Sequence, residues 1–221
     1  YDCLGAGAFN FLAASEPFKD DQDVYAAFGE LSIPFTENLE VQIAARYENY
    51  GGDVGDTLDP KIAARWDVLP TVTLRGSLSS SFRAPTLNQL GGEFTALSFV
   101  NRALAFKAID TQGNPNLDPE KAISSNLGVI WQPNDVTYIS VDYWNFDFSD
   151  PIVIESFEDV VSNCFDATSD IQDVACEKIT FQTPGDTTTG IQRIAVDYQN
   201  GPDIETSGID YVATYDFITN D

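Results

Sequence analysis

The sequence predicts an all-β fold, an antiparallel up-and-down sheet of about seven long strands. Three observations support this fold. Segments alternate apolar and polar residues, nearly all of them are about nine residues or longer, and short connectors alternate with long ones. Residues 38–50, NLEVQIAARYENY, show the alternation most clearly, because every odd position from Leu39 to Tyr47 is apolar.

The alternation places each strand in turn. We expect strands at about 23–33, 38–48, 60–68, 71–82, 121–132, 135–147 and 203–217. The alternation is cleanest at 62–68, 72–79, 123–131 and 209–217, and within these stretches no charged residue falls on the apolar face. The sixth segment keeps its phase as far as Tyr143 and then changes to Phe146 and Phe148, which predicts a β-bulge near Trp144.

Pattern alone does not decide whether the apolar face lies in a soluble sandwich core or against lipid. Strand length favours the membrane, because a tilted transmembrane strand needs about 9–11 residues and a soluble strand about 5–6. Connector lengths agree with this choice. The joints PFTE, LP and PN are tight, whereas the connectors at 49–59, 83–120 and 148–202 are long. Short turns at one end and long loops at the other are typical of an outer-membrane barrel.

Aromatic residues are placed at both ends of the strands, as in the two interfacial girdles of a barrel. The short-turn ends carry Phe35, Trp66, Trp131 and Phe217, and the long-loop ends carry Tyr47, Tyr50, Phe82 and Phe146. The alternative is that these rings pack in a sandwich core. We expect the apolar face to meet lipid, with Glu40, Arg46 and Glu48 facing a polar lumen.

Composition excludes several classes of function. The 221 residues carry a net charge of −24, so nucleic acid phosphates would repel the chain. No His is present, which excludes triad chemistry and most zinc sites. We therefore predict no catalytic residue, no metal and no cofactor. The chain also contains no Met, which predicts a processed product or a piece of a longer protein.

Four motifs in order resemble the barrel of TonB-dependent outer-membrane receptors. They are SSSFRAPTLNQL at 79–90, GNPNLDPEKA at 113–122, VDYWNFDFSDPI at 141–152 and NGPDIETSGIDYVATYDF at 200–217. The strand and turn VYAAFGELSIPF at 24–35 are also similar to those of this family. Together these segments cover nearly all of the chain from 24 to 217.

The resemblance implies a 22-stranded barrel in the bacterial outer membrane, of which residues 1–221 are a middle part. It also implies an N-terminal plug domain, absent here, through which the TonB complex supplies energy for import. The partners would be outer-membrane lipid and an extracellular small ligand, such as a siderophore, cobalamin or a carbohydrate. The alternative from another class is a secreted β-sandwich that binds carbohydrate through surface aromatics.

Four residues are candidates for facing the ligand in the vestibule: Arg83, Asn88, Gln89 and Trp144. The first three follow the expected end of a strand at Phe82. The alternative is that Arg83 pairs with a neighbouring carboxylate at the rim and that the following proline ends the strand.

The last long connector contains two cysteines, Cys164 and Cys176. If this loop faces the outside of the cell, we expect a disulfide between them, because two Cys without His are too few for a metal site. Cys3 has no expected partner within the chain. The connector is also predicted to contain a short helix at 157–163 and a hairpin within 178–199.

Acidic groups form another candidate site. The run at 20–23 and the spaced Asp53, Asp56 and Asp59 supply the oxygen ligands that Ca²⁺ prefers. None matches the twelve-residue calcium loop, so solvated charge is the favoured interpretation.

Overall fold

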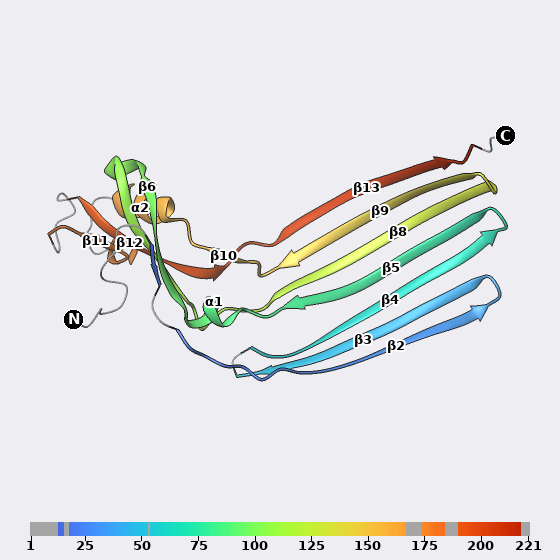
Figure 1. Cartoon of the computed structure of the whole chain (residues 1–221), viewed down its shortest axis with the longest axis horizontal. Coiled ribbons are helices and arrows are strands. Elements are labelled where there is room, and N and C mark those ends of the chain that lie inside the picture. Colours follow the sequence, from blue (N-terminus) through green and yellow to red (C-terminus); the bar gives the residue numbers. More distant parts are fainter. Residues whose placement is uncertain (1–12, 16–17, 53, 167–173, 184–189, 218–221) are drawn as a thin grey trace. The chain divides into compact units, whose positions relative to one another are not determined.

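The computed structural model describes residues 13–15, 18–52, 54–166, 174–183 and 190–217. The chain divides into two compact units, whose elements are labelled in Figure 1. The strand unit comprises Asp23–Ala84, Pro119–Pro151 and Pro202–Asp221, and the loop unit comprises Tyr1–Gln22, Pro85–Asp118 and Ile152–Gly201.

The strand unit is one antiparallel sheet with the strand order β13-β9-β8-β5-β4-β3-β2 (Figure 1). Its strands are β2 (Tyr25–Thr36), β3 (Leu39–Gly51), β4 (Gly55–Leu69), β5 (Val72–Arg83), β8 (Glu120–Asn134), β9 (Thr137–Ser149) and β13 (Ile204–Tyr215). All seven predicted strands are confirmed. Each is 12 to 15 residues long, well above the usual length of a soluble strand.

The register gives the sheet two different faces. Across neighbouring strands Leu31 pairs with Ile43, and Ile43 pairs with Ile62. Paired residues point to the same side of a sheet, so apolar side chains gather on one side, the apolar face. It is formed by Leu31, Val41, Ile43, Ile62, Trp66, Leu74, Leu127, Val129, Val141, Tyr143, Ile209 and Tyr211.

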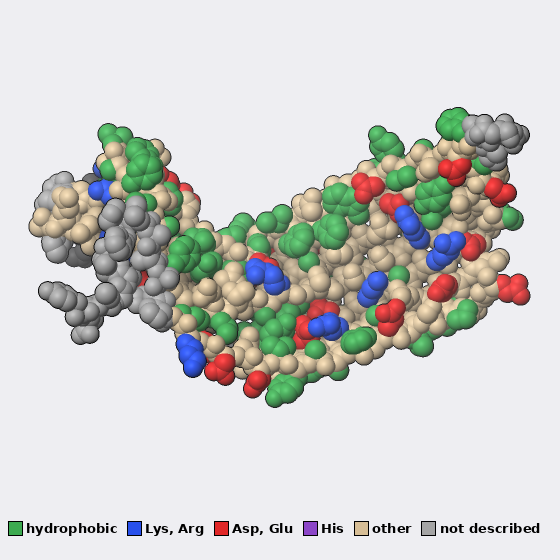
Figure 2. All heavy atoms as spheres, in the orientation of Figure 1, with side chains coloured by type: hydrophobic (Ala, Val, Ile, Leu, Met, Phe, Trp, Pro, Cys, Tyr) green, Lys and Arg blue, Asp and Glu red, His purple; other side chains and the backbone are tan. Residues whose placement is uncertain are grey.

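The opposite side, the polar face, carries most of the charge of the sheet. Its members include Glu30, Gln42, Arg46, Glu48, Lys61, Arg65, Arg75, Ser77, Asn126 and Asp142. Figure 2 shows acidic and basic side chains distributed over the strands of this unit. Glu40, Arg46 and Glu48 share this face, as the alternation predicts.

The apolar face is open in the described part of the strand unit. Ile43, Trp66 and Leu127 are 46%, 48% and 64% exposed. A soluble sandwich would bury these three side chains in its core, so the exposures contradict that alternative. An apolar face of this extent requires a hydrocarbon environment instead of water.

The long loop predicted at 49–59 is wrong. β3 continues to Gly51 and β4 starts at Gly55, so a tight turn joins them. Gly51, Gly52 and Gly55 all have positive φ, which permits the turn. β4 accepts Pro60 because the pairing of β4 with β5 begins only at Lys61.

The β-bulge predicted near Trp144 is also wrong. β9 pairs without a shift through Tyr143, Trp144 and Phe146 with both neighbours, and the irregularity lies in β8 between Trp131 and Asn134. The hydrophobic pattern therefore changes face while the strand stays regular. Phe146 lies on the polar face and does not belong to the lipid girdle where the aromatic pattern placed it.

The apolar face also changes along β9, from apolar to polar side chains after Tyr143. Beyond Tyr143 it carries Asn145 and Asp147 on β9, and the Asn145 amide donates to Glu205 Oε1 of β13 at 2.8 Å. β9 has 13 residues, more than the 9–11 that cross the hydrocarbon, so part of it extends beyond, and the polar Asn145 and Asp147 indicate that this part is its C-terminal end. There water replaces lipid outside the sheet, and polar side chains become favourable on that side.

The loop unit is built from the N-terminal segment and from the two long connectors after β5 and after β9. Its elements are β1 (Ala13–Ser15), α1 (Leu87–Gly91), β6 (Glu93–Val100), η2 (Asn101–Ala103), β7 (Ala105–Gln112), β10 (Ile152–Ile154), α2 (Phe157–Asp166), α3 (Val174–Glu177), β11 (Ile179–Phe181) and β12 (Ile191–Asn200). The sheet order is β1-β6-β7-β12-β10, with β11 paired to β12. The parallel β7–β12 pair, with Ile109 opposite Ile194, joins the two connectors.

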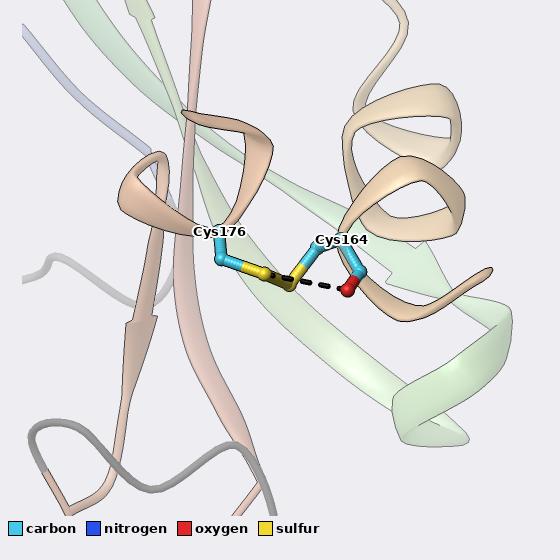
Figure 3. The surroundings of a disulfide bond; sticks show 2 residues. All are labelled: Cys164 and Cys176. Atoms are coloured by element: carbon cyan, nitrogen blue, oxygen red, sulfur yellow. Dashed lines mark hydrogen bonds between the residues drawn. A yellow bond between two sulfur atoms is a disulfide. The ribbon is translucent and has the colours of Figure 1, made fainter. Parts of the chain in front are cut away.

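The described residues of the loop unit enclose a hydrophobic core. The core contains Val100, Ile109, Val160, Val161, Cys164, Cys176, Ile179, Phe181, Ile191, Ile194 and Val196. Cys164 and Cys176 form the predicted disulfide, which joins the end of α2 to α3 (Figure 3). The predicted helix is confirmed as α2 and the predicted hairpin as β11 with β12. Cys3 lies outside the described residues.

The sequences of β6 and β7 show no regular alternation of apolar and polar residues, so this hairpin was not predicted. Its buried positions include Thr95, Asp110 and Thr111 beside apolar Ala108 and Ile109, so burial there does not follow hydrophobicity. Among the described residues, no helix is long and apolar enough to span a membrane.

Candidate functional site

A salt bridge crosses three strands in the middle of the polar face. Arg75 Nε donates to Asp142 Oδ1 at 2.8 Å and Arg75 Nη2 to Oδ2 at 2.6 Å. Arg75 of β5 and Asp142 of β9 both pair with Gly128 of the strand between them. A side chain at Gly128 would overlap Asp142, so glycine is what allows this contact.

We expect Gly128→Ala to destabilise the folded barrel by about 1–3 kcal/mol, because the added methyl group separates the Arg75–Asp142 pair. The matched control is Gly29→Ala on β2, where a methyl group would meet nothing within 4 Å. Urea unfolding of both full-length variants in detergent measures the difference. Equal midpoints for the two variants would contradict this role of Gly128.

Arg83 forms an ion pair at the end of the sheet. Its guanidinium contacts both carboxylate oxygens of Glu120, the residue opposite in the β5–β8 register. The expected alternative, pairing with a rim carboxylate, is confirmed. Glu120 belongs to the segment GNPNLDPEKA, so this pair links two of the motifs.

Asn88 and Gln89 lie on α1, in the loop unit, whereas Arg83 and Trp144 lie in the strand unit. Thr86 is the N-cap of this short helix, and the Gln89 side chain accepts from the Thr86 backbone N–H at 2.9 Å. This capping box uses the Gln89 side chain to start the helix. Asn88 is exposed.

Trp144 belongs to a row of three rings that we call the aromatic ladder: Trp144, Phe146 and Phe148, all on the polar face of β9. Ring centroids lie 5.6 Å apart for Trp144 and Phe146 and 6.1 Å apart for Phe146 and Phe148. The indole lies over Gly208 of β13, whose added Cβ would be 2.5 Å from Trp144 Cζ2. Glycine in the segment SGID thus makes room for the ring.

The polar face is also hollowed near its centre. A hollow of about 360 Å³ is lined by side chains of both charges and by amides, including Glu40, Gln42, Lys61, Arg65, Arg75 and Asn126. Arg75 is held there by Asp142, and Arg65 contacts Asp67 at 3.2 Å. Opposite charges are therefore paired on this surface.

Two ionic networks stabilise the loop unit. Arg193 of β12 makes a two-pronged contact with Asp110 of β7, and the Thr95 hydroxyl donates to Asp110 Oδ1 at 2.6 Å. The hydrogen bonds to Asp110 raise the pKa of Arg193 above its ordinary value. This pair lies across the parallel β7–β12 contact and fixes its register.

Lys178 forms the second network, with Glu155 at 2.5 Å and Asp197 at 2.9 Å. Burial alone would lower the pKa of Lys178, but the hydrogen bonds to the two carboxylates outweigh it and raise the pKa. Lys178 therefore stays charged and links β12 to the segments that precede α2 and β11.

The described residues contain no group of three or more His, Cys, Asp or Glu side chains placed to hold a metal ion. Asp59 accepts from the Thr57 hydroxyl at 3.2 Å and from the Ser80 hydroxyl at 3.1 Å. Asp53 of the proposed acidic group lies outside the described residues.

A sheet of long strands with one exposed apolar face and one charged face defines a portion of an outer-membrane β-barrel. The family model described as TonB dependent receptor-like, beta-barrel matches residues 4–220. The chain therefore belongs to this family, which places it in the bacterial outer membrane.

Known relatives agree with this assignment. The probable TonB-dependent siderophore receptor PirA of Acinetobacter baumannii is 23% identical over 160 residues, which cover 69% of this chain and 20% of that protein. The iron-regulated outer membrane virulence protein of Vibrio cholerae is 24% identical over 128 residues, covering 58% of this chain and 18% of that protein. The chain thus spans about a fifth of the length of these relatives.

Solved structures share the fold. The crystal structure of PirA from Acinetobacter baumannii matches with a TM-score of 0.62 and 18% identity, covering 88% of this chain and 26% of that one. The Serratia marcescens hemophore receptor HasR, solved with its hemophore HasA and heme, matches with a TM-score of 0.58 and 14% identity, covering 92% of this chain and 32% of that one.

Proposed function

We propose that this chain is part of the barrel of a receptor that captures a scarce nutrient outside the cell and imports it. Relatives named as a siderophore receptor and as an iron-regulated protein favour an iron-carrying ligand over cobalamin or a carbohydrate. Family membership supports a barrel of 22 strands, an N-terminal plug and energy supplied by the TonB complex.

The observation that carries this proposal is the two-faced sheet. Ile43, Trp66 and Leu127 are exposed on one face, and the other face holds paired charges around a hollow. This arrangement suits a wall between lipid and a water-filled lumen. The loops that follow β5 and β9 form a unit with its own core and disulfide, which suits a preorganised capture surface.

Among the candidate ligand-facing residues, Trp144 has the strongest support. Its ring lies on the polar face beside Phe146, and its neighbours across the sheet are small or polar: Asn126 and Gly208. Arg83, Asn88 and Gln89 remain candidates at the ends of the strands and on α1, although the side chains of Arg83 and Gln89 already have partners within the chain.

The test uses a strain that lacks the full-length receptor, grown under iron limitation with radiolabelled iron(III) chelates. We expect uptake of at least one chelate to be lost in this strain, restored by the cloned gene, and abolished by a protonophore that removes the energy supply. Unchanged uptake of every chelate would contradict the proposal.

A further inference from the structure

Three of the four sequence motifs meet in one junction of the loop unit, although they lie far apart along the chain. The residues that meet are Gln89 of the motif at 79–90, Asn114 and Asp118 of the motif at 113–122, and Asn200 of the motif at 200–217. The first three residues belong to the loop after β5, whereas Asn200 ends β12 in the loop after β9. The junction therefore joins the two long loops.

Within the loop after β5, main-chain contacts hold α1 against the second of these motifs. The backbone N–H of Gly113 donates to the Gly92 carbonyl at 2.7 Å. The backbone N–H of Asn114 donates to the Gln89 carbonyl at 2.8 Å. A side chain at position 113 would come within 2.6 Å of the Gly91 nitrogen, so glycine permits this close approach. The start of this loop is thereby fixed to its end.

The side chain of Asn114 extends the contact to the other loop. Its Nδ2 donates to the carbonyl oxygen of Tyr198 in β12 at 2.9 Å. Its Oδ1 accepts from the backbone N–H of Asn116 at 2.9 Å, which fixes the orientation of the amide. Through its backbone and its side chain, Asn114 thus joins α1, its own turn and β12.

Asn200 makes the reciprocal contact from the loop after β9. Its Nδ2 donates to the Asp118 carbonyl at 2.9 Å, and its Oδ1 accepts from the Asp118 backbone N–H at 2.9 Å. The amide thereby pairs with the main chain of Asp118 as the backbone of a neighbouring strand would. The backbone of Asn200 itself pairs with Ile152 in the β10–β12 ladder. Each loop therefore supplies one asparagine that bonds the main chain of the other.

We propose that Asn114 and Asn200 form a clasp that makes the loops after β5 and β9 open as one cooperative unit. Neither loop can leave the junction without breaking hydrogen bonds of the other. The parallel β7–β12 pair and the contact of Arg193 with Asp110 hold the same two loops together further along. Segments joined at several points gain and lose their order together. The clasp is thus a positioning device for α1, which carries Asn88 and Gln89.

Hydrogen–deuterium exchange of the full-length receptor in detergent tests the clasp. Asn114→Asp and Asn200→Asp keep the shape of the side chain but set a carboxylate oxygen against a carbonyl oxygen in place of the donor. We expect each change to speed exchange about threefold to tenfold, the range that corresponds to the net contribution of one hydrogen bond. The effect should reach the opposite loop: β10 and β12 for Asn114→Asp, and α1 with the amide of Gly113 for Asn200→Asp.

The matched control is Asn116→Asp, which adds the same charge two residues from Asn114 at an exposed position and should leave exchange unchanged. Amides of β8 and β9 serve as the internal reference, and heat-dependent migration on a gel shows that each barrel is folded. Faster exchange confined to the substituted loop would overturn the clasp. So would equal acceleration in Asn116→Asp, or acceleration that includes β8 and β9. No ligand is needed, so none of these outcomes bears on the proposed import function.

Discussion

Val41→Arg is expected to destabilise the folded full-length receptor by about 2–4 kcal/mol in a bilayer, because it places a charge in the hydrocarbon near its midplane. Val41 pairs with Ile33 and Ala64 in the middle of the apolar face. Its neighbours offer no carboxylate at this level, so the guanidinium would have to reach the interface or draw water into the lipid. Leu74→Arg, between Trp66 and Val129, should act in the same way.

Gln42→Arg is the matched control, one residue further along β3 and on the polar face. Gln42 donates to Glu30, and an arginine would keep this contact as an ion pair. We expect a change within about 0.5 kcal/mol, as for ordinary surface positions. Urea titration of folding into lipid vesicles measures all three variants. Equal losses for Val41→Arg and Gln42→Arg would refute the assignment of the faces.

Removal of the disulfide is expected to destabilise the loop unit by about 3 kcal/mol, the cost of opening a loop of this length in the unfolded chain. Cys164 and Cys176 are 12 residues apart and both buried in the core. In Cys164→Ser with Cys176→Ser, hydroxyls replace sulfurs among apolar side chains, which adds a polar burial penalty. The measurement is the rate of limited proteolysis between α2 and β12 in intact cells.

The strand unit supplies the internal control for this experiment. It has no part in the disulfide, so heat-dependent migration of the double variant should match that of the parent. An unchanged rate of cleavage in the loop unit would show that the core holds α2 and α3 without the covalent link.

The strands of the sheet were predictable because apolar and polar residues alternate along most of them. Residues 38–50 show this directly, and their neighbours repeat the same period. The predicted bulge near Trp144 failed because the pattern was assumed to follow one environment along the whole strand. The polar residues Asn145 and Asp147 indicate that β9 leaves the lipid after Tyr143, where the same regular geometry favours the opposite assignment of polar and apolar residues.

The contacts of the site could be predicted only in part. Arg83 and a rim carboxylate were expected, since both lie where strands end. The pair of Arg75 with Asp142, 67 residues apart, depends on a strand order that places Gly128 between them. The sheet of the loop unit could not be predicted for a similar reason. Its parallel pair of β7 and β12 joins segments that are far apart in the sequence and share no pattern that would identify them as partners.

The most direct test of the account is a spin-label scan along β9 of the full-length receptor in lipid vesicles, from Ile139 to Phe148. Oxygen, which concentrates in lipid, should reach labels at Ile139, Val141 and Tyr143, whereas a water-soluble nickel chelate should reach Asn145 and Asp147 on that same side. High oxygen contact at Ser140 and Asp142, or a transfer of oxygen contact to Phe146 and Phe148, would contradict it.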